Sequence, residues 1–457
     1  MTAGCVPRPV GRSAHAALVD RVRAGYLALP PGTAVRLAKP TSNLFRPRDR
    51  PVSGLDVSGL DGVIAIDPQR RTADVQGMCT YETLVDATLA HGFMPLVVPQ
   101  LRTITLGGAV SGLGVESSSL RNGLPHESVL EMDILTGAGE IVTASASENP
   151  GLFAAFPNSY GSLGYALRLR IALEPVQPFV TLRHVRFSEV DDLVSAVAQI
   201  GRDEHWEGGP VAFVDGVAFG RGECYLTLGS WAATGPGSDY TRQKVYYRSI
   251  RERREDRLSV RDYLWRWDTD WFWCSSAFGL QKPLVRRIWP RRYRRSDVYH
   301  RIVAFENRHG YAAALERWRG KPPRERVVQD VELPLERTAE FVDWFAGHVG
   351  MSPVWLCPLR THRSWPLYPL EPGRTYVNVG FWGSVPITDG RSDGDVNRAI
   401  ERVVSDMGGH KSLYSDAYYE PDEFDALYGG QTLRTVRAQY DPQGRLVELY
   451  DKVVGRR

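Results

Sequence analysis

The pattern of apolar and polar residues in the first part of the chain predicts short strands and helices. Residues 61–77 contain two alternating apolar stretches around a Pro-Gln-Arg-Arg turn, which predicts a pair of strands. Residues 80–92 predict a helix that Thr80 caps and Gly92 ends. One face of this helix is expected to carry Leu84, Val85, Thr88 and Leu89.

The same pattern continues to Pro175. Residues 128–144 predict two strands joined by a Gly-Ala-Gly turn, and the segment NPGLFAAF at 149–156 predicts a short helix. Residues 161–175 predict a strand that closes the unit. Residues 1–180 are therefore expected to form a mixed α/β domain.

Residues 181–395 have a different pattern. Strand-like segments such as ECYLTLGSWA and TYVNVGFWG alternate there with helical ones such as RTAEFVDWFAGHVG. This order predicts an antiparallel sheet with helices on one face, as a second domain or cap. Residues 396–457 begin with a helix that a Gly-Gly pair ends and return to the pattern of the first domain. The predicted fold class is α+β.

The composition excludes several classes of function. The chain has 53 acidic and 56 basic residues among 457, so its net charge of +3 gives no reason to expect nucleic acid as a partner. Five cysteines form no close pair and ten histidines show no metal-ligand spacing, so we expect a reducing compartment and no catalytic metal. Residues 1–30 lack the apolar core of a signal peptide, and no run of about 18 apolar residues occurs. A cytoplasmic location is therefore expected.

A glycine-rich stretch at residues 103–123, TITLGGAVSGLGVESSSLRNG, is the main candidate for chemistry. Apolar, strand-like segments flank it, which is not typical of a linker. Its serines lack the GxSxG pattern of a nucleophile, no lysine completes a Walker loop, and the Rossmann pattern fits only loosely. Two interpretations remain. The stretch is either a cradle whose backbone amides bind a diphosphate, or a turn packed tightly beneath a sheet.

Several motifs together resemble one protein family. They are GGAVSGLGVESSS at 107–119, PVWLCPL at 353–359 and LYSDAYYEPDEF at 413–424. These motifs resemble the vanillyl-alcohol oxidase, or para-cresol methylhydroxylase (PCMH), family of FAD-linked oxidoreductases. Within that family the likeness is to the 24-dehydrocholesterol reductase (delta-24 sterol reductase) branch, and it extends from about residue 60 to the end of the chain.

The resemblance implies how the domains are organised. A PCMH-type FAD-binding domain of two α/β subdomains would comprise residues 1–180 and be completed by the C-terminal segment 396–457. Residues 181–395 would form an antiparallel-sheet cap that holds the substrate over the flavin. No histidine or cysteine stands at a recognisable linking position, so FAD is expected to bind non-covalently.

The resemblance also implies which residues lie near FAD. Many family members carry an RGGG-like turn where this chain has LAKPTSNLFRP, so Thr41, Ser42 and Asn43 are expected to supply donors to the diphosphate instead. Glu116 would be repelled by the phosphates and is expected to turn toward a ribose hydroxyl or the flavin, or to pair with Arg121. The remaining expected contacts are Thr105, Gly107, Gly108, Ala109, Gly112, Gly114, Ser117, Ser118, Gly123, Ile141, Val142, Gly161 and Gly164.

Reduction of an isolated alkene by a flavin needs a protein acid that supplies a proton. Tyr414 is the favoured proton relay, because a phenol is neutral at pH 7 and can donate, and Asp416 and Lys411 are the other catalytic candidates. Packing or helix-end charge would equally explain these residues. Further candidates near the expected pocket are Arg360, His362 and Asn378.

Residues 246–295 combine five tryptophans with many arginines. This mixture is suited to peripheral contact with a membrane or to a lipophilic ligand with an anionic end, and less to nucleic acid. Equally, the tryptophans could pack the core of the cap while the arginines pair with nearby acids.

The function expected from the sequence is FAD-dependent reduction of a C=C bond in a sterol, terpenoid or other lipophilic substrate, with NADPH or NADH as electron donor. The alternative is an oxidase or dehydrogenase that acts on an alcohol or C–H bond and passes electrons to oxygen or another acceptor. A flavin-free lipid-binding protein that kept the fold is a third hypothesis, and it would purify colourless.

Overall fold

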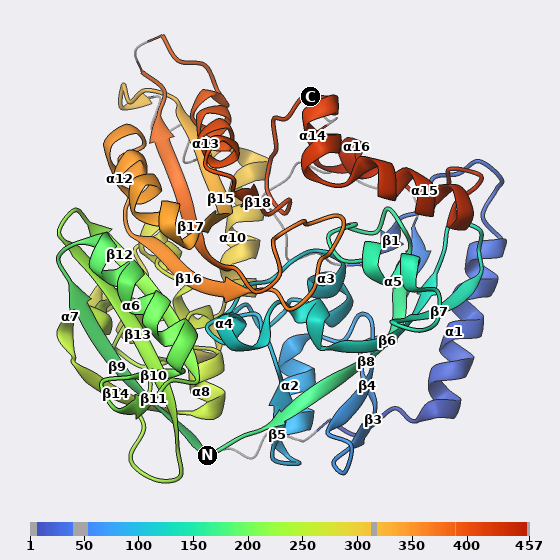
Figure 1. Ribbon diagram of the computed structural model, residues 1–457, viewed down its shortest axis with the longest axis horizontal. Helices are drawn as coiled ribbons and strands as arrows, with labels where there is room; N and C mark the ends of the chain where they lie inside the picture. Colours follow the sequence, from blue (N-terminus) through green and yellow to red (C-terminus); the bar gives the residue numbers. More distant parts are fainter. Residues whose placement is uncertain (1–6, 40–53, 312–317, 389, 455–457) are drawn as a thin grey trace.

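The computed structural model describes residues 7–39, 54–311, 318–388 and 390–454 (Figure 1). Two sheets lie side by side, and strand β8 leads directly from the first sheet into β9 of the second. The C-terminal helices return to the first sheet. The predicted α+β class is confirmed.

The first sheet is built from hairpins that the sequence predicted. Its antiparallel strands run in the order β3 (Val63–Asp67), β4 (Thr72–Gln76), β8 (Tyr165–Pro175), β6 (Val129–Leu135) and β7 (Ile141–Ser145), and β5 (Phe93–Pro95) also pairs with β8. A smaller unit at the edge of this domain contains α1 (Arg12–Leu27) and the parallel pair β1 (Leu37–Ala38) and β2 (Leu55–Asp56).

The helices of the first domain are short. The Thr80 side chain accepts a hydrogen bond from the Thr83 amide, 3.2 Å away, which confirms the predicted cap of α2. Apart from α1, these helices are α2 (Tyr81–Leu89), α3 (Leu106–Ser111), α4 (Ser119–Asn122) and α5 (Pro150–Ala155).

The second sheet is antiparallel throughout. Its strands run in the order β14 (Glu255–Ser259), β9 (Phe179–Phe187), β13 (Glu223–Ala232), β12 (Phe213–Gly220), β16 (Val354–Arg360), β17 (Thr375–Pro386), β15 (Arg324–Pro334) and β18 (His410–Lys411). Alternate residues of each strand point to opposite faces of this sheet. On β17, for example, Val377 and Val379 pack on the helical face, whereas Trp382 points to the other face.

Both faces of the second sheet are covered, although helices were predicted on one face alone. One face packs against α6 (Val190–Asp203), α12 (Thr338–His348) and α13 (Asp395–Asp406), as Figure 1 shows. The other face packs against the first domain and against a segment with α7 (Tyr246–Glu252), α8 (Val260–Leu264), α9 (Pro283–Ile288) and α10 (Ser296–His309). One apolar core therefore continues from the first sheet into the second.

The C-terminal segment divides its contacts between the two domains. The predicted boundary at residue 396 is too early, because α13 packs on β15 and β18 pairs with β15. The chain then returns to the first domain, where Arg437 Nη1 donates to the Ser162 carbonyl oxygen at 3.0 Å. The helices of this return are α14 (Pro421–Leu427), α15 (Gly430–Tyr440) and α16 (Leu449–Val453).

Candidate cofactor and active site

Gly108 is the position in the glycine-rich stretch where the backbone is open to solvent. Its backbone amide donates to Thr105 Oγ1 at 3.2 Å, so Thr105 caps α3. Gly108 is exposed, whereas Gly107 and Ala109 on either side are buried. A Cβ added at Gly108 would meet no residue other than Thr105 within 4 Å. The backbone is therefore accessible to a ligand at this position.

The other predicted glycines pack against the protein itself. A Cβ on Gly107 would lie 2.6 Å from the carbonyl oxygen of Gly77, and one on Gly112 would lie 3.4 Å from the Tyr160 ring. These contacts account for the missing side chains without a ligand, so the packed-turn interpretation describes most of the stretch. The same holds for Gly114 between two prolines, Gly123 beside Glu127, Gly161 beside Tyr165 and Gly164 beside Leu135.

Lys39 adds a positive charge beside Gly108, and sequence reasoning missed it. Its Nζ atom lies 3.4 Å from Thr105 Oγ1. The predicted donors Thr41, Ser42 and Asn43 lie outside the described residues, directly after Lys39 and Pro40. An ammonium group beside an exposed stretch of backbone suits an anion such as a diphosphate.

A second loop, residues 158–164, adjoins the end of α3. The Asn158 and Tyr160 amides donate to the carbonyl oxygens of Gly112 and Ser111, at 3.2 and 2.8 Å. Asn158 and Tyr160 also have left-handed backbone angles, with φ of 61° and 48°. Such angles in non-glycine residues are costly and occur often at binding sites.

Buried polar atoms without a hydrogen-bond partner among the described residues lie in these loops. A buried polar atom costs free energy unless it is paired, so such a group fits a polar ligand between the loops. The atoms are Gln100 Oε1, Thr103 Oγ1, Asn158 Oδ1 and Ser159 Oγ.

Ser117 links the two domains, and Glu116 is buried next to it. Glu116 Oε1 accepts from the Gln100 amide at 2.6 Å, and burial holds the pKa of this carboxyl well above its usual range. The Ser117 carbonyl oxygen accepts from the Val214 amide of β12 at 2.7 Å. The expected pairing of Glu116 with Arg121 is wrong, because Arg121 donates to Glu174 at 2.8 Å.

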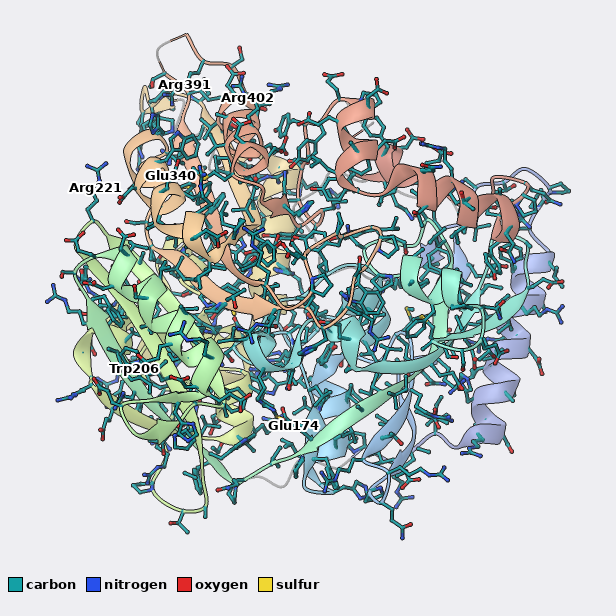
Figure 2. The ribbon with its side chains drawn as sticks, viewed as in Figure 1. Glu174, Trp206, Arg221, Glu340, Arg391 and Arg402 are labelled. Carbon is teal, nitrogen blue, oxygen red and sulfur yellow. The ribbon has the colours of Figure 1, made fainter. Side chains whose placement is uncertain are left out.

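The remaining predicted FAD contacts pack in the core or hydrogen-bond within the first domain. Ser118 Oγ donates to the Leu96 carbonyl oxygen at 2.8 Å, and Ala109 is part of the core. Ile141 and Val142 are half-buried at the start of β7, where they pack against different parts of the core. Glu174, the partner of Arg121, lies where β8 leaves the first sheet (Figure 2).

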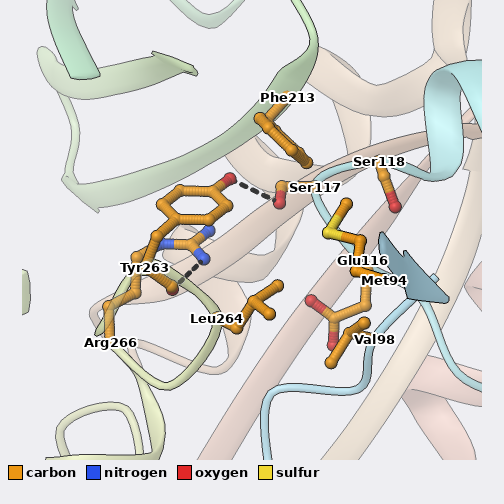
Figure 3. Close-up of a pocket in the computed structure, with 9 residues that line it drawn as sticks. All are labelled: Met94, Val98, Glu116, Ser117, Ser118, Phe213, Tyr263, Leu264 and Arg266. Atoms are coloured by element: carbon orange, nitrogen blue, oxygen red, sulfur yellow. Dashed lines mark hydrogen bonds between the residues drawn. The ribbon is translucent and has the colours of Figure 1, made fainter. Parts of the chain in front are cut away.

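A charged centre lies buried beneath the junction of the domains. Arg266 Nη2 donates to Asp215 Oδ2 at 2.9 Å, and each side chain is 1% exposed. Trp267 Nε1 donates to the same oxygen at 2.9 Å. The guanidinium lies 4.0 Å from the centre of the Tyr263 ring, and the Tyr263 hydroxyl lies 2.8 Å from Ser117 Oγ (Figure 3). The cavity here is about 10 Å³, about the size of one water molecule, so the centre is structural.

The face of the second sheet toward the first domain carries a polar cluster of three residues from separate segments. Asn378 Nδ2 donates to Asp330 Oδ1 at 3.0 Å, and the Tyr414 hydroxyl is a further hydrogen-bonding partner of Asp330. Trp382 Nε1 donates to the Tyr414 oxygen at 2.9 Å. Tyr160 of the first domain is among the groups that raise the pKa of Tyr414, so the cluster faces the FAD domain.

Removal from water changes the acid strengths in this polar cluster. Burial raises the pKa of Asp330 to about 6 and that of Tyr414 well above its usual range. Glu332, two residues along β15, is fully buried with its pKa raised to about 8, and it accepts hydrogen bonds from Tyr368 and Ser412. Asp330 is therefore the half-buried carboxyl of the cluster, with a pKa of about 6.

Lys411 and Asp416 do not join this cluster. Lys411 is fully buried and pairs with Glu401 of α13, and β18 places it opposite Val331, whose side chain lies on the helical face. Asp416 pairs with Arg326 at 2.8 Å near the surface. Both residues have structural partners, so the arrangement does not support the predicted catalytic roles.

Of the further candidates, Asn378 alone belongs to the polar cluster. Arg360 Nη2 donates to Thr375 Oγ1 at 2.8 Å, and His362 Nε2 lies 3.1 Å from the Arg121 carbonyl oxygen. Both therefore hold neighbouring segments together.

Aromatic side chains pack on one side of the polar cluster, where Trp382 contacts Tyr414. The rings of Phe272 and Trp382 lie 4.3 Å apart, and those of Trp273 and Trp382 lie 5.4 Å apart. Trp265, Trp267, Trp271 and Trp273 are all buried, which favours the structural interpretation of the tryptophans in residues 246–295. The aromatic side chains exclude water from one side of the cluster, so an apolar substrate is suited to this face.

Comparisons with known proteins identify the class of this site. Residues 41–145 match the FAD binding domain family. The delta(24)-sterol reductase of Homo sapiens is 24% identical over 419 residues, which cover 86% of this chain and 76% of that protein. The chain is an FAD-dependent oxidoreductase.

Other relatives extend the comparison. The delta(24)-sterol reductase of Arabidopsis thaliana is 21% identical over 447 residues, or 87% of this oxidoreductase and 76% of the plant protein. Cytokinin dehydrogenase 2 of Oryza sativa subsp. japonica is 34% identical over 124 residues, or 27% and 22% of the two chains. The resemblance stated from the motifs is therefore confirmed, and the FAD match speaks against a flavin-free protein.

The loops of the first domain fit FAD. Exposed Gly108, the Lys39 ammonium and the unpaired polar atoms of residues 100–103 and 158–159 would hold its polar groups. No helix in the described ranges has both the length and the apolar character needed to cross a membrane. Nor does any group of three or more His, Cys, Asp and Glu side chains in those ranges have the arrangement of a metal site.

Proposed function

We propose that this oxidoreductase reduces a carbon–carbon double bond of a sterol, terpenoid or other lipophilic substrate, with NADPH or NADH as electron donor. The donor gives up a hydride, the protein gives up a proton, and both add across the double bond to leave a saturated bond and NADP⁺ or NAD⁺. The delta(24)-sterol reductases, which match most of the chain, support this direction.

The observation that carries the proposal is a titratable acid, Asp330, in an aromatic-lined face of the cap. Asn378 donates to one oxygen of this carboxyl, and Tyr414 is its second partner. With a pKa of about 6, a fraction of Asp330 is protonated at neutral pH, so it can release a proton to a substrate carbon.

We assign Tyr414 a different role from the one expected from the sequence. Burial raises the pKa of the phenol, and a higher pKa makes it a weaker acid. Donation from its hydroxyl to the ionised carboxylate instead favours the charged form of Asp330. Tyr414 is therefore proposed as a positioning residue that tunes the pKa of Asp330.

Bound FAD supplies the carrier that takes a hydride from the donor and passes it on. Thr105 and Lys39 would hold its phosphates. Phe272 and Trp382, whose rings pack against each other, would contact the apolar substrate and keep water away from Asp330.

A second candidate function is dehydrogenation, which the match to a cytokinin dehydrogenase favours. In that direction ionised Asp330 would accept a proton while a hydride leaves the substrate. The match covers 27% of the chain, against 86% for the sterol reductase of Homo sapiens, so it carries less weight for the direction of the reaction.

An anaerobic titration distinguishes the two directions. The FAD-loaded protein is mixed with NADPH or NADH while the visible flavin band is recorded, and a sterol with a double bond at position 24 is then added. Bleaching by the nicotinamide and recovery with the alkene are expected. A band that neither nicotinamide bleaches, but that an alcohol or amine substrate does, would favour the dehydrogenase.

A further inference from the structure

Residues 282–293 form a surface with two exposed aliphatic side chains. Leu284 and Ile288 lie one helical turn apart on α9, and each is 80% exposed. Tyr293, in the short 3₁₀ helix Arg291–Tyr293 that follows, is 41% exposed. Single exposed apolar residues are common, but a group of them on one turn marks a contact surface. We call residues 282–293 the basic apolar ridge.

The basic apolar ridge is firmly attached to the cap. Arg286, on the inner side of α9, donates to both carboxylate oxygens of Asp270 at 2.7 and 3.0 Å, and both side chains are buried. The same guanidinium donates to the carbonyl oxygens of Tyr240 and Lys244 at 3.0 and 2.9 Å. A bidentate pair with added carbonyl acceptors fixes the orientation of α9. The outward position of Leu284 and Ile288 follows from this attachment.

The charge of the basic apolar ridge has one sign. The sequence KPLVRRIWPRRY contains no acidic residue. Four cationic side chains in it are exposed, of which Arg291 pairs with Asp239 from outside the ridge. These side chains are Lys282, Arg287, Arg291 and Arg292. The two aliphatic side chains are therefore surrounded by positive charge.

We propose that the basic apolar ridge docks this protein on an anionic lipid surface. Leu284 and Ile288 would insert among acyl chains, while the cations beside them bind lipid phosphates, as basic amphipathic surfaces do. A nucleic acid is a poorer fit, because the two most exposed side chains are aliphatic and have no ring on which a base could stack. This inference goes beyond the proposed reaction and does not depend on it.

The test measures sedimentation of the FAD-loaded protein with vesicles of phosphatidylglycerol and phosphatidylcholine, or of phosphatidylcholine alone. Binding to the anionic vesicles is expected, with a loss on addition of salt because the charges are exposed. L284S/I288S and R287E/R292E are each expected to weaken binding at least about tenfold. The matched control is L27S, because Leu27 is 61% exposed on α1 of the other domain and should leave binding unchanged.

Three results would overturn the proposal. They are an absence of binding to either kind of vesicle, equal binding by both double variants and the wild type, and an equal loss in L27S. Size-exclusion chromatography without lipid adds a further check. A dimer that L284S/I288S dissociates would assign the ridge to self-association instead.

Discussion

At the scale of single residues, the most direct test is the pH dependence that Asp330 should give to the reaction. Alkene reduction needs the protonated carboxyl, so activity is expected to be highest at acidic pH and to fall as pH rises through about 6. D330N keeps the shape of the side chain but cannot supply the proton. Its kcat should fall at least about 100-fold and lose this pH dependence, measured by substrate conversion between pH 5 and 9.

Tyr414 supplies an independent prediction in the same assay. Its hydrogen bond lowers the pKa of Asp330, so Y414F should raise that pKa and move the fall in activity to higher pH. Most of the rate at acidic pH should remain. If Tyr414 were itself the acid, Y414F would instead abolish turnover at every pH.

Glu332 is the competing acid on the same strand. A fall in activity centred near pH 8, abolished by E332Q and unaffected by D330N, would assign the proton to Glu332 and contradict the role given to Asp330. The internal hydrogen bonds of Glu332 to Tyr368 and Ser412 argue against that outcome.

At the scale of elements, α3 separates packing from cofactor binding. G107A would bring a Cβ to 2.6 Å from the Gly77 carbonyl oxygen, so it should destabilise the FAD-free protein by about 1–3 kcal/mol. G108A would bring a Cβ to 2.8 Å from Thr105 Oγ1 and to no other residue within 4 Å, so a shift of that one side chain should make room for it. This variant should therefore lose less stability than G107A, while its FAD binding weakens about tenfold. Thermal unfolding and a fluorescence titration with FAD measure the two effects. Unaltered FAD binding by G108A would contradict the assignment of the cradle.

The elements show what the sequence could predict. The strand pairs at 61–77 and 128–144 were predicted because their turns are local, and Thr80 was predicted as a cap for the same reason. The glycine pattern predicted a cradle but could not distinguish Gly108 from Gly107, because that difference depends on contact with Gly77.

The polar cluster was beyond such reasoning. The register of β15 and β17 sets Glu332 opposite Asn378, so Asp330 lies two residues along β15 and within hydrogen-bonding distance of Asn378. Tyr414, the other partner of Asp330, belongs to a third segment. A register between strands about 50 residues apart is a property of the folded sheet, not of either strand. Tyr414 was a candidate from the sequence alone, whereas Asp330 was not.

At the scale of the whole molecule, the two sheets share one core and should unfold together. All twelve tryptophans lie between residues 206 and 382, so their fluorescence reports mainly on the second sheet and the segments packed on it, whereas calorimetry reports on the whole chain. The two transitions are expected to coincide. R266M should lower both together, because it leaves Asp215 as a buried unpaired charge at a cost of about 3–5 kcal/mol. Two separate transitions would contradict a shared core.

The most direct measurement of the central claim is the fate of the double bond. The FAD-loaded protein is incubated anaerobically with a sterol that has a double bond at position 24 and with NADPH that carries deuterium at the position of hydride transfer. The mass of the product is then measured by mass spectrometry. The account predicts a saturated product that carries one deuterium and one solvent hydrogen, with D330N forming far less of it. Unchanged sterol, together with flavin that NADPH and NADH leave oxidised, would contradict the account.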